Sequence, residues 1–363
     1  MIDLTGCKEV FEDYAGSERK TALMYDGHVY MIKAPDPIRQ LNNDLSYMNN
    51  QFSEDIGCRI FKSLNIPTQD TFIAKYTNPE DNKTRIVVAC KDFRNKQIGE
   101  DLVSAGNINL RNFNSSKIIS SSIEDVDYVI NKINTIDKEA VKERFWDMFV
   151  GDALIANKDR HMDNWGFITK NYEIVRMAPV YDCGSSLGSL ISDEKMKEGL
   201  SNPNLFKDLE YNVASVYSIN EKRIFYHEIL KNPPEELKKA ILRIVPKINM
   251  NIIQNIVNNE EGMSDIRKNY LIKALTLRYE NILIPSLTKI MKEKYSSAEN
   301  IADIIIKDLK AGKSLKSIEK EAFKFIPDTS IVRKRAKYNE ALKLASKDKS
   351  VKKILEKQQD YER

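Results

Sequence analysis

The residues best suited to chemistry form two short segments near the middle of the chain. Residues 157–164 contain Asp159, with an amide five positions later at Asn164, and residues 181–185 contain Asp182 in the run Tyr-Asp-Cys-Gly-Ser. An aspartate can accept the proton of a substrate hydroxyl, and amide and carboxylate oxygens are ligands that Mg²⁺ prefers. The spacing therefore predicts phosphoryl transfer, with Asp159 as base and with Asn164 and Asp182 as metal ligands.

The order of these residues matches the catalytic and metal-binding loops of protein kinases. The five-residue step from Asp159 to Asn164 equals the aspartate-to-asparagine step of their catalytic loop, and Asp182 opens an Asp-Cys-Gly run where they have Asp-Phe-Gly. The histidine follows the aspartate here, as His161, instead of preceding it. We count His161 among the catalytic-loop residues and favour orientation of the loop over proton transfer as its role.

Phosphoryl transfer from ATP also requires a strand lysine near the phosphates and a helical glutamate that pairs with it. Lys33 ends the apolar run Val-Tyr-Met-Ile-Lys, and Glu54 lies in the next expected helix. A second apolar run ends at Cys90 and continues into Lys-Asp-Phe, which places Asp92 in an expected hinge whose backbone meets adenine. These residues predict an ATP site.

A phosphate-binding loop is the weakest part of this prediction. Residues 11–19 are expected to join an earlier strand to the strand at 20–25. They contain a single glycine, Gly16, followed by Ser17. Backbone amides around these two residues could cradle phosphate, but an ordinary hairpin loop explains the same residues equally well.

The elements that must position these residues are a sheet-rich first part and a helical second part, which predicts an α+β protein with two lobes. Apolar residues at four-residue steps predict a helix over residues 43–64, and an Asp-Gly pair at 26–27 predicts a hairpin. The expected strands are residues 20–25, 28–33, 71–76, 85–90, 165–169 and 172–177. The chain after about residue 195 is expected to be helical.

These elements divide the chain into four parts. The expected parts are an N-lobe over residues 1–93, a polar connector or insertion over 94–138, a helical C-lobe over 139–295 and a basic helical extension over 296–363. Within the C-lobe helix expected over residues 138–157, Asp152 lies near the apolar stripe. A buried acid needs a partner, and the backbone of the catalytic loop is the expected one.

The composition indicates a globular protein, with no pattern of a disulfide framework, a cysteine metal site or a membrane span. Hydrophobic residues make up 42% and charged residues 30% of the 363 positions, as in globular proteins. The four cysteines show no disulfide or metal spacing, and we expect Cys183 to be a packing residue and Trp146 and Trp165 to lie in the core. With no membrane span and no signal-peptide pattern, a cytoplasmic location is expected, and export by a specialised system would leave no mark.

The charge is concentrated at the C-terminal end. The net formal charge is +4, and residues 330–363 hold 11 Lys/Arg against 5 Asp/Glu. This basic end is either a solvated helix face or a site for an anionic partner, and the sequence holds no specific nucleic-acid motif.

Taken together, the motifs resemble those of the HipA-like kinase family. The element Asn-x-Asp-Arg-His-x-x-Asn (157–164) and the element Tyr-Asp-x-Gly-Ser (181–185) are the marks of its C-lobe. The resemblance implies a bilobal, HipA-type kinase fold, ATP and magnesium as cofactors, and serine or threonine phosphorylation, often with autophosphorylation. It also implies that Ser17 is a candidate regulatory phosphorylation site and that the chain acts as an effector or toxin-like kinase.

Two other functions stay open at this point. Phosphatidylinositol kinases also carry Asp-Arg-His-x-x-Asn ahead of a later Asp-x-Gly, so a lipid or small-molecule acceptor is an alternative to a protein. The second alternative is a nucleotide-binding pseudokinase scaffold, which would bind ATP without turnover. The protein substrate itself is not indicated by the sequence.

Overall fold

The computed structural model describes residues 1–11, 21–35, 48–112 and 121–360. It divides the chain into two compact units, Met1–Leu283 and Ile284–Arg363. All residues expected to take part in chemistry belong to the first unit. The fold combines a curled mixed sheet with many helices, which confirms the α+β class.

A six-stranded sheet forms the N-terminal lobe. Its order is β1-β5-β6-β4-β3-β2. The strands are β1 (Ile2–Asp3), β2 (Lys8–Val10), β3 (Thr21–Tyr25), β4 (His28–Lys33), β5 (Thr71–Asn78) and β6 (Lys83–Lys91). Asp26 and Gly27 have positive φ values of 47° and 73°, the geometry that the predicted two-residue hairpin between β3 and β4 requires.

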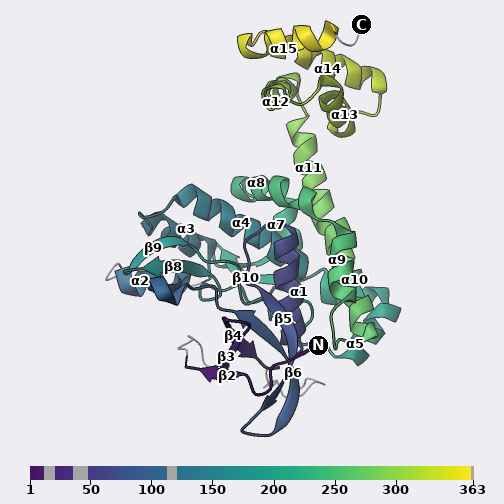
Figure 1. The fold of residues 1–363 in the computed structure, drawn as a ribbon. Coiled ribbons are helices and arrows are strands. Elements are labelled where there is room, and N and C mark those ends of the chain that lie inside the picture. Colours follow the sequence, from purple (N-terminus) through teal and green to yellow (C-terminus); the bar gives the residue numbers. More distant parts are fainter. Residues whose placement is uncertain (12–20, 36–47, 113–120, 361–363) are drawn as a thin grey trace. The chain divides into compact units, whose positions relative to one another are not determined.

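Helix α1 (Asn50–Ser63) packs against β5 and β6, and Figure 1 shows it beside β5. Phe52, Ile56 and Ile60 lie buried at four-residue steps along it, as the sequence pattern predicts. The described helix begins at Asn50, and residues 43–47 of the expected helix lie outside the described residues. The helix is the element that carries Glu54.

The segment expected as a polar connector, 94–138, contains regular structure. Strand β7 (Glu100–Ser104) pairs with β8 (Gly166–Lys170), which pairs with β9 (Glu173–Met177), so this segment completes a three-stranded sheet. It also contains η1 (Lys96–Ile98), α2 (Ala105–Asn112) and α3 (Ile123–Lys132). Helix α3 buries only three apolar residues, Val126, Val129 and Ile130. Because polar residues surround this narrow apolar stripe, the sequence did not indicate a helix here.

The remainder of the first unit is a helical lobe built around α4 (Lys138–Ile155). Both tryptophans lie in its core, as expected: Trp146 is 4% and Trp165 1% exposed. The other helical elements are α5 (Asp193–Ser201), α6 (Pro203–Glu210), α7 (Tyr226–Lys231), α8 (Glu235–Ile244), η2 (Val245–Lys247), α9 (Met250–Asn258), α10 (Asp265–Arg278) and the π-helical segment η3 (Tyr279–Leu283). The connection from α10 through η3 is continuous.

One expectation for this lobe is wrong. The chain after residue 195 is not entirely helical, because β10 (Ala214–Ile219) and β11 (Lys222–Phe225) form an antiparallel hairpin. Alternating β-branched and aromatic residues favour the strands, and Asn220 and Glu221 form the turn with φ values of 48° and 64°. The turn lacks glycine, so the usual hairpin signal was missing.

The second unit is a helical domain with its own core. Its helices are α11 (Ile284–Lys294), α12 (Ala298–Lys310), α13 (Leu315–Phe325), α14 (Ile331–Ala345) and α15 (Lys349–Asp360). Ile301, Ile305, Ile318 and Ala341 are among its buried residues. An anionic partner for this basic end stays a prediction. Among the described residues of the whole chain, no helix combines the length and apolar character that a bilayer crossing needs.

Candidate active site

The structure brings together three charged residues that lie far apart in the sequence. Lys33 ends β4, Glu54 lies in α1, and Asp182 follows β9. The Lys33 Nζ atom is 3.1 Å from Asp182 Oδ1 and 3.4 Å from Glu54 Oε2. The backbone N–H of Asp182 also donates to Glu54 Oε1 at 3.0 Å. The glutamate therefore holds both the lysine and the backbone of the expected metal ligand.

Charge pairing keeps the lysine of this cluster protonated despite burial. Burial disfavours the charged lysine, but the carboxylates of Asp182 and Glu54 outweigh it and raise the pKa of Lys33 well above its usual value. Glu54 is 1% exposed, and burial raises its pKa, while Lys33 acts in the opposite direction. Lys33 is therefore a cation held in a fixed position in the site. The Asp182 side chain beside it is 39% exposed.

Close packing against α1 positions the segment around Asp182. A Cβ atom added at Gly57 would lie 2.7 Å from the Cβ of Cys183, so only glycine permits this approach of the helix. The Ser53 hydroxyl donates to the Ser186 carbonyl at 2.8 Å. Asp182 itself adopts a left-handed backbone conformation, with φ of 59°, which is uncommon for a residue other than glycine. Cys183 is fully buried, in agreement with the packing role expected for it.

The catalytic loop holds Asp159 by its backbone and leaves its carboxylate accessible. The Asp159 N–H donates to Asn157 Oδ1 at 3.0 Å, and Asn164 Nδ2 donates to the Asp159 carbonyl at 2.7 Å. The Ser185 hydroxyl lies 3.5 Å from Asp159 Oδ2. The Asp159 side chain is 49% exposed. Partial burial raises its pKa, Asp182 raises it further, and His161 lowers it.

Arg160 joins the expected catalytic loop to the segment that contains Asp182. Its guanidinium forms two hydrogen bonds, of 3.0 and 3.1 Å, to the carboxylate of Asp152. It also donates to the carbonyls of Asn164, at 2.9 Å, and Tyr181. Burial opposes the charge, but Asp152 outweighs it and raises the pKa of Arg160. One buried cation therefore fixes the backbone on both sides of the site.

This role of Arg160 was not expected from the sequence, and the partner expected for Asp152, the loop backbone, is wrong. Asp152 does not bind loop backbone through its carboxylate; the side chains of Arg160 and Asn157 bind it, the latter at 2.9 Å. The sequence feature that could have indicated this pair is that Asp152 and Arg160 carry opposite charges, lie eight positions apart and are both close to an apolar helix. Arg160 and Asp152 are each 1% exposed, and buried charges of this kind need each other.

His161 lies at the edge of the loop and is 37% exposed. Its Nδ1 accepts a hydrogen bond from the Asp163 N–H at 3.2 Å, and its Nε2 is 3.9 Å from Asp159 Oδ1. Both contacts suit a residue that orients the loop. The assignment of that role stays a prediction.

The expected hinge residues are held by other parts of the protein. Cys90 is buried inside β6, between β4 and β5. The Asp92 N–H donates to the Val29 carbonyl at 2.9 Å, and its carboxylate accepts two hydrogen bonds of 2.9 and 2.6 Å from the Arg94 side chain. The side chains of Cys90 and Asp92 and the N–H of Asp92 are thus engaged within the protein, and a nucleotide contact by the hinge stays a prediction. The loop residues Gly16 and Ser17 lie outside the described residues.

The donor set suits magnesium. Because Asn164 Nδ2 is bound to the Asp159 carbonyl, the amide oxygen is the atom available as a ligand. Asp182 adds a partly exposed carboxylate. Hard oxygen ligands from few protein groups are what Mg²⁺ takes when phosphate oxygens complete its shell. Within the part of the chain that the structure describes, no group of three or more His, Cys, Asp or Glu side chains would hold a metal.

Comparisons with known proteins identify relatives of this chain. Residues 13–250 match the family model for the HipA-like C-terminal domain. The serine/threonine-protein kinase CtkA of Helicobacter pylori is 35% identical over 289 residues, which is 78% of this chain and 86% of that protein. The crystal structure of the H. pylori proinflammatory kinase CtkA superposes with a TM-score of 0.71 at 33% identity, covering 80% of this chain and 98% of that one.

Proposed function

This chain belongs to the HipA-like C-terminal domain family and is a serine/threonine kinase, and we propose that it transfers phosphate from ATP with the aid of Mg²⁺. The observation that carries the proposal is the position of Lys33 between Asp182 and Glu54. A strand lysine paired with a helical glutamate, next to a metal-binding aspartate, is the arrangement that binds nucleotide phosphates in protein kinases.

Each residue has a distinct task in the proposed reaction. Lys33 binds the ATP phosphates, and Glu54 keeps its amine in place. Asn164 and Asp182 hold Mg²⁺, which when bound neutralises charge on the phosphates. Asp159 accepts the proton of the substrate hydroxyl as that oxygen forms its bond to the γ-phosphorus and the bond to ADP breaks.

The raised pKa of Asp159 suits this role, because a stronger base takes the hydroxyl proton more readily. Arg160 acts on the reaction only by positioning, since it holds the carbonyls of Asn164 and Tyr181. His161 contributes by orienting the loop that carries Asp159.

We further propose that the kinase phosphorylates itself and acts as an effector or toxin-like kinase. Cys7, Cys58, Cys90 and Cys183 are all free thiols, which supports a reducing cytoplasm as its place of action. That cytoplasm belongs either to the producing cell or, after export, to a recipient cell.

Incubation of the pure protein with γ-labelled ATP and Mg²⁺ tests this function. We expect label on serine or threonine of the chain itself, absent from Asp159→Ala and Asp182→Ala and removed by chelation of the metal. Phosphatidylinositol vesicles in a parallel reaction are expected to stay unlabelled. Label that enters only the lipid would assign a lipid kinase, and ATP binding without any turnover would assign a pseudokinase.

A further inference from the structure

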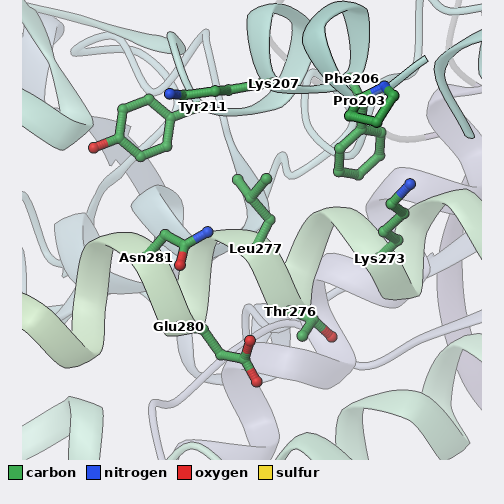
Figure 2. Close-up of a pocket in the computed structure, with 9 residues that line it drawn as sticks. All are labelled: Pro203, Phe206, Lys207, Tyr211, Lys273, Thr276, Leu277, Glu280 and Asn281. Atoms are coloured by element: carbon green, nitrogen blue, oxygen red, sulfur yellow. The ribbon is translucent and has the colours of Figure 1, made fainter.

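A groove that the phosphoryl-transfer residues do not use runs between α6 and α10. It has a volume of about 600 Å³. One wall carries Phe206, Lys207 and Tyr211, and the other carries Lys273 and Leu277, followed by residues of η3. Figure 2 shows the Phe206 ring and the Leu277 side chain pointing into the space between the two walls. The groove therefore has an apolar floor.

Two lysines border this floor, and both lie over aromatic rings. Lys273 Nζ lies 4.5 Å from the centre of the Phe206 ring and donates to the Leu200 carbonyl at 3.3 Å. Lys207 Nζ lies 5.5 Å from the centre of the Tyr211 ring. An ammonium group has three donor hydrogens, so these contacts leave each lysine able to bind an anion. The charge at the groove is complementary to carboxylates.

Glu280 is the acidic residue that lines the groove, and its carboxylate does not neutralise the two lysines. Glu280 lies in η3, which continues α10, and Figure 2 shows its carboxylate directed away from the wall formed by α6. Figure 2 shows the Lys207 amine beside Tyr211 at one end of the groove and the Lys273 amine beside Phe206 at the other, so a cation borders each end of the apolar floor.

Buried polar contacts hold the two walls in a fixed relation. The Tyr270 hydroxyl of α10 donates to Glu210 Oε1 of α6 at 2.8 Å, and the Arg278 guanidinium binds the other oxygen of that carboxylate. Arg278 Nε also donates to the Leu154 carbonyl at 2.6 Å. Leu154 lies in the last turn of α4, five positions before Asp159. The groove is therefore preformed and anchored to the helix that leads into the catalytic loop, which lowers the cost of binding.

We propose that this groove is a docking site for an acidic segment of the protein substrate, an inference that rests on the proposed kinase function. The wall from Lys273 to Asn281 spans about 12 Å at the ~1.5 Å rise per residue of a helix. An extended peptide covers that length with about four residues at ~3.3 Å each. One large apolar side chain would fill the floor beside Leu277, and neighbouring Asp or Glu residues would bind Lys207 and Lys273. Such docking raises the local concentration of a substrate without touching the reacting atoms.

Selection from a displayed library of random 12-residue peptides tests the docking site, with the full-length protein as bait and no ATP present. We expect enrichment of peptides that carry a large apolar residue next to at least two acidic ones. Synthetic copies of the enriched peptides, measured by fluorescence polarisation, should bind at least tenfold more weakly to Lys207→Glu/Lys273→Glu and to Leu277→Asp. Lys222→Glu, a charge reversal at an exposed position of β11, is the matched control and should bind as the wild type does.

Three results would overturn the docking site: no enrichment, enrichment of basic peptides, or equal affinity of the double variant. Competition by tripolyphosphate as effective as that by the peptide would assign a small-anion site instead. Fusing an enriched peptide to a peptide that the kinase phosphorylates should lower the KM for that substrate and leave kcat unchanged. Autophosphorylation without any peptide binding would refute the docking site alone. Peptide binding by a protein that labels neither itself nor the fused peptide would refute the kinase function and leave only a peptide-binding groove, so the two failures are distinguishable.

Discussion

The amine of Lys33 lies 3.1 Å from Asp182 Oδ1, although 149 positions separate the two residues in the sequence. The cation proposed to bind phosphate is thus paired with the carboxylate proposed to bind metal. Glu54 contacts both partners, through its carboxylate to the lysine and to the backbone of the aspartate. In the proposed reaction, binding of Mg-ATP would exchange these ionic contacts for contacts to the metal and the phosphates.

Replacing Lys33 by methionine should strongly reduce turnover and also destabilise the fold. We expect kcat/KM to fall by about 10²–10³, because an electrostatic contact to the ATP phosphates is lost. Glu54 would remain buried without its cation, so its pKa should rise further and the free energy of unfolding should drop. Kinetics and chemical denaturation at pH 7 measure the two effects.

The double variant Lys33→Met/Glu54→Gln separates these effects. It should regain part of the stability lost in the single variant, because no unpaired charge is left buried, but none of the activity. Equal stability of the single and double variants would show that the Lys33–Glu54 pair does not act as described.

The activity should fall with decreasing pH because Asp159 must be ionised to accept a proton. Burial raises the pKa of Asp159, so the acidic limb of the kcat profile should lie above the pH at which an ordinary aspartate titrates. His161 lowers that pKa, so His161→Gln should move the limb to higher pH while the plateau rate stays within about tenfold. A His161→Gln limb that moves to lower pH would contradict this electrostatic role, and loss of the plateau itself would instead indicate proton transfer by the histidine.

Local patterns were sufficient to predict four of the six strands of the N-terminal lobe and its helix, and to single out charged residues that the structure brings together. The Asp-Gly turn before His28 and the four-residue apolar steps through Phe52 and Ile56 depend on neighbours in the sequence, and the structure has those elements. The five-residue step from Asp159 to Asn164 is likewise local, and the loop it defines is held by a hydrogen bond across that step.

Features that depend on distant partners could not be predicted in this way. Strand β7 exists because β8 lies beside it, more than sixty positions later, and its own residues carry a weak pattern. Arg160 gains its role only when folding brings Tyr181 and Cys183 to its guanidinium. The groove between α6 and α10 is formed by helices whose sequence gives no sign that their surfaces face one another.

Removing Arg160 should have a far larger effect than removing a surface arginine. Arg160→Met leaves Asp152 buried and without its cation, so we expect the free energy of unfolding to fall by about 3–5 kcal/mol. Arg243→Met is the matched control: its pair with Asp147 is partly exposed, and its loss should cost about 1 kcal/mol or less. Denaturant titration of both variants decides the comparison.

Asp152→Asn/Arg160→Gln tests whether Arg160 also positions the site. The double variant should recover stability relative to Arg160→Met, because both charges are gone. Its kcat should remain at least tenfold below the wild-type value, because the carbonyls of Asn164 and Tyr181 lose their donor. Full recovery of kcat together with stability would show that the arginine serves folding alone.

A buried acid outside the active site should make stability depend on pH. Glu260 is 2% exposed, and its Oε2 lies 3.1 Å from Arg59 Nη1, which also lies 3.3 Å from Asp55 Oδ2. Burial, together with the charge of Asp55, raises the pKa of Glu260 to about 9. The folded chain therefore keeps this proton between the ordinary glutamate pKa and about 9, whereas the unfolded chain releases it.

The sign of the effect follows from proton binding. Since the folded state binds more protons in this window, the contribution of Glu260 to the free energy of unfolding decreases as pH rises through it. Glu260→Gln, which keeps the shape and removes the proton, should match the wild type near pH 5 and exceed it by about 1–3 kcal/mol at pH 9. Urea titrations across this range measure the difference, with the exposed Glu173→Gln as a control that should show none. A Glu260→Gln variant that is less stable at every pH would mean that Glu260 stays ionised and that its pair with Arg59 is a net stabilising contact.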